Sequence, residues 1–367
     1  MRFGHRFLLI ASGALMTVAG LSAEGQGPSI SITEFPMPPD VFSPWQITSG
    51  PDGNLWFTVQ NVPAYIGRIT PAGLITLFPI PTPSSQPTGI ARGADGNLWF
   101  TETASNKIGR LSPFTQTFAE FPLPTPDSGP AGIAAGSDGN LWFCENTSNN
   151  IGRITPAGVI TEFALPNGGH PVPIVRGSDG KLWFTYPGAG AQRIGSITTA
   201  GAINEIPFPA NVANLISDLE GIASGPDGNL WSIGQAFSGQ DQIVRVTPAG
   251  VFTMFPTLSL FIESEAISAG PDGNVWYAVN NGSKMARVTP AGVMTEFDIP
   301  TPRAEVGGIT TGPDGNLWFT EIYPINQIAR VNLAAASVPV PTLSLLTSIL
   351  LGVMLVAAGL IAIRVQR

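Results

Sequence analysis

Six glutamates of this chain stand at two recurring positions, where carboxylates could bind cations or move protons. Three precede short segments of small or apolar residues, and three follow W-F-T or W-F-C; they are Glu220, Glu265 and Glu305, and Glu102, Glu145 and Glu321. If the fold gathers them, their like charges raise one another's pKa or recruit a cation. The alternative is that the second three belong to a repeat and bond to neighbouring loops.

Few other residues have a chemistry of their own. His170, in G-G-H-P-V-P-I, is the only histidine after residue 23, and we interpret it as a solvated loop residue; a role as base or ligand is the alternative. Cys144 is the only cysteine, so the chain forms no internal disulfide. Thr occupies the matching place in sister repeats, and Cys144 is therefore expected to be a buried strand residue.

A repeat must position these side chains. Seven Asp-Gly pairs recur, each followed at a constant offset by tryptophan; their aspartates are Asp52, Asp95, Asp138, Asp179, Asp227, Asp272 and Asp314. The spacing of about 40 to 50 residues, with strand-like segments, indicates a propeller or a solenoid. Each turn offers one Asp, whereas a Ca²⁺ loop needs several oxygen ligands in close series. Turn chemistry therefore explains the aspartates better.

One repeat unit predicts four antiparallel strands, which make one propeller blade. The expected strands are 132–136, 141–145, 151–155 and 159–163. The Asp-Gly pair between the first two favours a type I′ hairpin turn, and P-A-G makes the turn between the last two. The first strand carries small residues, as crowding at a propeller axis requires.

The chain ends predict a closed ring. The seventh copy stops after its third strand, 328–332, and the missing fourth strand matches I-S-I-T-E-F at 30–35. We therefore expect an all-β, seven-bladed propeller of four-stranded blades over 28–333, because closure removes exposed strand edges. Both hairpin turns lie on one side, so the variable loops and the channel mouth, where a site is expected, lie on the other.

Both termini resemble targeting segments. Residues 1–23 combine Arg2 and Arg6 with an apolar run and L-S-A, which predicts a cleaved signal peptide; an uncleaved anchor is the alternative. A Pro-containing linker, 334–342, precedes an uncharged stretch at 343–363, long enough for a transmembrane helix. The end, 364–367, carries Arg364 and Arg367 and is expected in the cytoplasm. We expect an exported protein, anchored at the cell envelope or surface, or released after processing.

Composition narrows the possible partners. The formal net charge is −8, and residues 24–333 contain all the acids, about −12 in total. A phosphate backbone repels such a surface, so we expect no nucleic-acid partner. We expect a monomer that binds a small molecule, a glycan or a protein at the channel mouth, with a membrane contact through 343–363.

Two stretches resemble known families. P-T-L-S at 341–344, the apolar stretch and the basic end resemble IPTL-type sorting signals, relatives of PEP-CTERM tails, which implies a processing protease. The repeats G-P-D-G-N-L-W-F-T-E and I-G-R-I-T-P-A-G, across 30–332, resemble the streptogramin lyase (virginiamycin B lyase) family. That resemblance implies ring opening of a cyclic depsipeptide by elimination, with a His base and Mg²⁺ held by two Glu.

The resemblance assigns roles to single positions. Glu305 in E-V-G-G-I and Glu321 in W-F-T-E match the family's two metal ligands, whereas Gly307 occupies the place of its base. Glu265 in S-E-A-I stands where the family has a second, substrate-binding His, and Trp45 in P-W-Q-I matches its substrate-contacting Tyr. Glu265 is then the candidate for a substitute base, with His170 as another candidate.

These positions leave two functions open. The preferred hypothesis is a ligand- or partner-binding module that lacks the catalytic His, with Trp45, Glu220 and Glu265 at the rim of the site. The alternative is a Mg²⁺-dependent lyase or lactone-opening enzyme in which Glu305 and Glu321 hold the metal.

Overall fold

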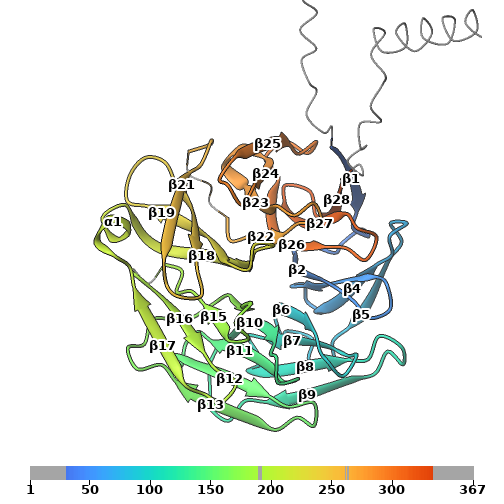
Figure 1. The fold of residues 1–367 in the computed structure, drawn as a ribbon. Helices are drawn as coiled ribbons and strands as arrows, with labels where there is room; N and C mark the ends of the chain where they lie inside the picture. Colours follow the sequence, from blue (N-terminus) through green and yellow to red (C-terminus); the bar gives the residue numbers. More distant parts are fainter. Residues whose placement is uncertain (1–29, 189–191, 261, 263, 334–367) are drawn as a thin grey trace, which may run out of the picture.

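Seven four-stranded sheets surround a common centre as the blades of a propeller (Figure 1). The computed structural model describes residues 30–188, 192–260, 262 and 264–333. Within them each strand pairs antiparallel with the next one in its blade, and the chain then crosses to the following blade. The all-β class and the seven-bladed architecture are confirmed.

The strands follow one order from the axis outward. Blades 1 to 3 consist of β2 (Pro44–Ser49), β3 (Leu55–Val59), β4 (Tyr65–Ile69) and β5 (Ile75–Pro79); β6 (Pro87–Arg92), β7 (Leu98–Glu102), β8 (Lys107–Leu111) and β9 (Phe118–Pro122); and β10 (Pro130–Ala135), β11 (Leu141–Glu145), β12 (Asn150–Ile154) and β13 (Ile160–Ala164). Blades 4 and 5 consist of β14 (Ile174–Arg176), β15 (Leu182–Phe184), β16 (Arg193–Ile197) and β17 (Ile203–Pro207); and β18 (Ile216–Ser224), β19 (Leu230–Ala236), β20 (Gln242–Val246) and β21 (Phe252–Pro256). Blades 6 and 7 consist of β22 (Ile267–Ala269), β23 (Val275–Val279), β24 (Lys284–Val288) and β25 (Met294–Asp298); and β26 (Glu305–Thr311), β27 (Leu317–Tyr323), β28 (Gln327–Asn332) and β1 (Ser31–Pro36). The short helices α1 (Ala210–Ala213) and η1 (Asn280–Gly282) lie in connections.

The N-terminal strand closes the ring, as predicted. β1 pairs antiparallel with β28 from Ser31↔Asn332 to Pro36↔Gln327, and Figure 1 shows the two side by side. The Phe35 ring stacks on Trp318 with centroids 5.4 Å apart. Blade 7 is therefore built from both ends of the described chain.

The Asp-Gly turns are structural, but their type differs from the prediction. Gly139 has φ 78°, whereas Asp138 is not among the residues with positive φ, so the turn is not type I′. Gly139 N–H instead donates to the Gly136 carbonyl, which indicates a type I turn followed by a left-handed glycine. The Asp138 carboxylate accepts from the Asn140 side chain at 2.7 Å and from Trp142 Nε1 at 3.2 Å. These bonds to its own repeat explain the aspartate without calcium.

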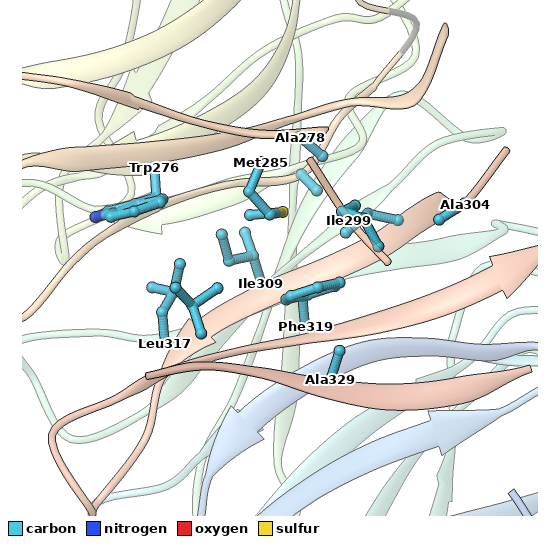
Figure 2. Close-up of a cluster of buried hydrophobic side chains, with 12 residues drawn as sticks. Trp276, Ala278, Met285, Ile299, Ala304, Ile309, Leu317, Phe319 and Ala329 are labelled. Carbon is cyan, nitrogen blue, oxygen red and sulfur yellow. The ribbon is translucent and has the colours of Figure 1, made fainter. Parts of the chain in front are cut away.

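Side chains between adjacent blades form the core. Figure 2 shows Trp276 and Met285 of blade 6 facing Leu317 and Phe319 of blade 7, all fully buried. Close approach near the axis explains the small residues of the inner strands. A Cβ added to Gly89 would lie 2.6 Å from the Ala131 carbonyl oxygen of the next blade.

The predicted terminal segments lie outside the described residues. This holds for the signal peptide at 1–23, the linker at 334–342, the transmembrane helix at 343–363 and the basic end at 364–367. No helix in the described part of the chain is long and apolar enough to cross a membrane.

Candidate functional site

One repeated position places a residue from each of the seven blades near the axis. It lies two residues before an isoleucine that recurs in every inner-strand segment, and we call it the axial position; it holds Trp45, Thr88, Ala131, Val172, Glu220, Glu265 and Gly307. In blades 1, 2, 3, 5 and 7 the pairing register shifts at this point. Such a bulge re-aims a side chain out of the ladder. The axial residues can therefore line the channel instead of packing between blades.

Two cavities lie along these positions. The smaller, about 140 Å³, is lined by axial residues of several blades, including Trp45, Thr88, Val172 and Glu265. The larger, about 550 Å³, we call the mouth cavity; it is lined by Trp45, Glu220, Ile233, Gln235, Ala236, Asp241, Ser264, Glu265, Asn280, Glu305, Val306, Gly307 and Ile322. The mouth cavity opens among blades 5, 6, 7 and 1, and blade 7 contributes to it through β26 and β27.

Glu220 is the electrostatic centre of the mouth cavity. Its pKa is raised to about 8. Burial is the largest cause, and the charges of Asp218 and Glu265 and a hydrogen bond with Asp218 add to the increase. Asp241 adds a weaker effect of the same sign. At neutral pH Glu220 is therefore largely protonated, and a bound cation would favour its ionised form.

Glu265 and Glu305 complete the carboxylate set. Glu265 is exposed to the cavity, yet its concave surroundings desolvate it, and that burial raises the pKa of the carboxyl. Glu305 begins β26 and is also exposed. The predicted rim residues Glu220 and Glu265 thus share one cavity with Glu305.

Trp45 is the aromatic wall of the mouth cavity. It is half-buried, whereas the seven repeat tryptophans are at most 1% exposed. Its own carbonyl oxygen accepts a hydrogen bond from Thr320 Oγ1 at 2.6 Å, which fixes the backbone against blade 7. A half-exposed aromatic face beside carboxylates suits an organic cation, since the ring attracts positive charge.

Glu321 lies elsewhere. It is fully buried and does not line the mouth cavity; its Oε2 accepts from Gln327 Nε2 at 2.9 Å, and its Oε1 has no partner. Burial first, and the charge of Glu34 second, raise its pKa to about 7. Glu102 and Glu145 are buried in the same way. Glu321 therefore resembles its repeat copies more than the sequence suggested.

The two predicted Mg²⁺ ligands have different surroundings in this structure. Glu305 faces the cavity, while Glu321 faces Gln327 and the side of Glu34. Among the described residues no group of three or more His, Cys, Asp or Glu side chains is placed to hold a metal ion. The Mg²⁺ site at Glu305 and Glu321 stays a prediction.

The other two candidates are remote from the mouth cavity or enclosed. His170 is exposed in a loop, where its Nδ1 lies 2.9 Å from the Asn146 carbonyl oxygen, and it lines neither cavity. Cys144 is fully buried, and burial raises the pKa of its thiol well above the usual value. A protonated, enclosed thiol is a poor nucleophile.

Sequence reasoning missed Asp218 and Asp241. Asp218 precedes Glu220 by two residues, a spacing that places both on one face of a regular strand, and the hydrogen bond between them shows that they stay adjacent despite the register shift. Asp241 gave no signal, because it lies in the β19–β20 loop and acts through tertiary contacts. Its Oδ1 accepts from Ala236 N at 2.9 Å and its Oδ2 from Ile262 N at 2.6 Å.

The fold and the axial cavities define a seven-bladed propeller with a ligand-sized site at one end of the channel. The model of the virginiamycin B lyase family matches residues 26–117 and 217–342. A structure described as streptogramin B lyase is 36% identical, with a TM-score of 0.75, covering 83% of this chain and 98% of that one. A catalytically inactive His-to-Ala variant of virginiamycin B lyase from Staphylococcus aureus, with quinupristin, is 33% identical, with a TM-score of 0.75 and coverages of 83% and 99%.

The chain belongs to the virginiamycin B lyase family. Selenomethionine-substituted virginiamycin B lyase from Staphylococcus aureus gives a similar match, at 34% identity and a TM-score of 0.74, over 83% of this chain and 99% of that one. No curated protein sequence gave a significant match.

Proposed function

We propose that this protein is a binding module whose ligand site is the mouth cavity. The observation that carries the proposal is the lining of that cavity, which combines Trp45 with the carboxyl groups of Glu220, Glu265 and Glu305 and contains no imidazole. Such a cavity offers an aromatic face and carboxyl groups but no histidine base. Recognition of a ligand requires only the first two.

The catalytic positions support binding over turnover. The relative crystallised with quinupristin is described as inactive after a single His-to-Ala change, so that enzyme depends on a histidine. In this chain the family resemblance assigns Gly307 and Glu265 to the two histidine positions. Glycine has no group that accepts a proton, so the elimination lacks its base at that position.

The alternative function is a lyase or lactone-opening enzyme in which a carboxylate replaces the imidazole. The raised pKa of Glu265 favours it, because a carboxylate of higher pKa is a stronger base. Mg²⁺ held by Glu305 and Glu321 belongs to this alternative.

The location of the module follows from its terminal segments. We propose an exported protein that is anchored at the envelope by the helix expected at 343–363, or released by a sorting protease, with the propeller outside the cytoplasm. The argument rests on the sequence of 1–23 and 334–367.

Quinupristin is the probe that tests binding against turnover. Because Trp45 is the one tryptophan not buried among blades, ligand entry should change the protein's fluorescence, and Trp45→Phe should abolish that change. We expect binding with recovery of intact quinupristin, with or without Mg²⁺. Chromatography and mass spectrometry give the outcome, since elimination leaves the mass unchanged but alters retention, whereas hydrolysis adds one water. Turnover that Glu265→Gln abolishes would replace binding with the alternative, and a fluorescence change that persists in Trp45→Phe would contradict the site.

A further inference from the structure

Four exposed apolar side chains lie on segments of blades 7 and 1, the two blades that supply Trp45, Glu305 and Ile322 to the mouth cavity. Phe42, Val62, Tyr323 and Ile325 are each between 51% and 75% exposed, and we call them the apolar shelf. Phe42 comes from the segment before β2 and Val62 from the β3–β4 loop. Tyr323 ends β27, and Ile325 lies in the β27–β28 loop. Large apolar side chains exposed together at one site usually mark an interaction surface.

Hydrogen bonds hold the three segments of the shelf together. Asn61 Oδ1 accepts from Phe42 N at 2.6 Å, and Asn61 Nδ2 donates to the Asp40 carbonyl at 3.0 Å. From blade 7, Asn326 Oδ1 accepts from Ser43 N at 2.7 Å. The shelf is therefore organised before any partner arrives, which lowers the entropic cost of binding.

The shelf continues into the site. Tyr323 follows Ile322, which lines the mouth cavity, and its Cα pairs with that of Glu305 across β26 and β27. Glu305 and Asn280 line both the mouth cavity and a second cavity of about 550 Å³, which Tyr323 and Arg303 also line. The two cavities thus form an extended depression, more suited to a chain segment than to a compact molecule.

Charge specifies which segment fits. The mouth cavity is lined by Glu220, Asp241, Glu265 and Glu305 and by no basic side chain, while Arg303 lines only the second cavity. Basic side chains of a ligand are therefore attracted to the mouth end, beside Trp45, and the adjoining shelf accepts apolar side chains.

We propose that the site binds an amphipathic cationic peptide, with lysine or arginine side chains in the mouth cavity and apolar side chains on the shelf. The inference rests on the proposed binding function and narrows its ligand class. It commits to a peptide because one small amine would occupy the mouth cavity and leave the shelf unused.

A short synthetic peptide of alternating lysine and leucine tests the proposal by fluorescence titration at low salt. Phe42→Ser with Ile325→Ser should weaken binding about tenfold through lost apolar contact. Glu220→Gln with Glu265→Gln should weaken it by a similar factor, because a bound lysine favours the ionised form of both carboxyl groups and glutamine cannot ionise. The matched control is Phe114→Ser with Val251→Ser, two side chains 70% and 59% exposed on the turn side of the ring, and it should leave affinity unchanged.

Two further peptides separate charge from apolar contact. A lysine–serine peptide should bind at least about tenfold more weakly than the lysine–leucine peptide, and a glutamate–leucine peptide should not bind. The role of the shelf is overturned if the lysine–serine and lysine–leucine peptides bind equally. It is also overturned if Phe42→Ser with Ile325→Ser leaves the affinity for the lysine–leucine peptide unchanged. If quinupristin still binds at Trp45 while the lysine–leucine peptide does not, the peptide inference fails and the proposed binding function stands.

Discussion

Glu145 shows how this fold treats a carboxyl group that it buries completely. Its Oε2 accepts from Ser148 Oγ at 2.7 Å and from Asn150 Nδ2 at 3.0 Å, its Oε1 has no partner, and burial raises its pKa to about 7. The next blade has Tyr186 at the same repeat position, where its hydroxyl donates to Glu205 at 2.6 Å. In blade 4 a neutral O–H group therefore donates to the neighbouring glutamate. A protonated Glu145 can donate to Glu162 in the same way.

This burial makes stability depend on pH. The folded pKa of about 7 exceeds the unfolded value of 4.5, so the contribution of Glu145 is complete below 4.5 and is lost as pH rises through 7. We expect the free energy of unfolding to fall between about pH 5 and about pH 8, by up to about 3 kcal/mol for this group. Glu145→Gln should reduce that fall when measured by urea unfolding.

The control for charge alone is Asp40→Asn, an exposed carboxylate that removes the same charge. It should leave the pH dependence of the wild type intact. If the wild-type protein is equally stable at about pH 5 and about pH 8, folding does not raise the pKa of Glu145.

At the scale of the element, the inner strands combine close packing with a register shift that frees the axial side chains. Gly221 in β18 has no room for a side chain, because an added Cβ would collide with the Glu265 carbonyl oxygen of the next blade. Gly307 in β26 has more room, since the nearest neighbours of an added Cβ would be Ile322 Cγ2 at 3.1 Å, Thr320 Oγ1 at 3.2 Å and the Trp45 carbonyl oxygen at 3.2 Å. A side chain is therefore excluded more strictly at Gly221 than at Gly307.

Alanine substitutions measure this difference. Gly221→Ala should destabilise the protein by about 3 kcal/mol, because two backbones must separate. Gly307→Ala should cost about 1 kcal/mol, since its neighbours, the Trp45 carbonyl among them, need to yield by only a few tenths of an ångström. Urea unfolding of both variants checks the order, and an equal cost would contradict the contact between Gly221 and the neighbouring backbone.

At the scale of the whole molecule, closure by β1 joins the mouth cavity to the stability of the ring. Blades 7 and 1 supply Trp45, Glu305 and Ile322 to the cavity, and Thr320 Oγ1 connects them through the Trp45 carbonyl. Arg330 adds a second link, because it donates to the Pro71 carbonyl of blade 1 at 2.9 Å while its guanidinium lies 5.4 Å from the Trp318 ring centroid. Opening the ring would therefore weaken both hydrogen bonds between blade 7 and blade 1, the one from Thr320 and the one from Arg330.

Removing residues 30–36 tests this closure. We expect the shortened protein to be less stable than the full chain and to self-associate, because β28 becomes an unpaired edge. Unfolding and light scattering report the two effects, with Phe35→Ala as the milder variant that keeps the strand but removes the stack on Trp318. A stable monomer after the deletion would contradict the role of β1.

The repeat alone determined the architecture of this protein. Asp-Gly turns, buried tryptophans and I-S-I-T-E-F at the start predicted seven blades and their closure, because each unit encodes the same local turns and strand alternation. The predicted type I′ turn was wrong, because the three-residue loop needs a left-handed conformation only at its glycine.

Only the tertiary structure decided which acids meet. Glu220, Glu265 and Glu305 come from three blades and reach one cavity because inner strands converge on the axis, whereas Glu321 follows the alternation of β27 into the layer between blades. Asp241 joins them from a loop whose path the repeat does not encode. Spacing along the chain specifies a blade, but the direction of a side chain at the channel depends on register shifts and on neighbouring blades.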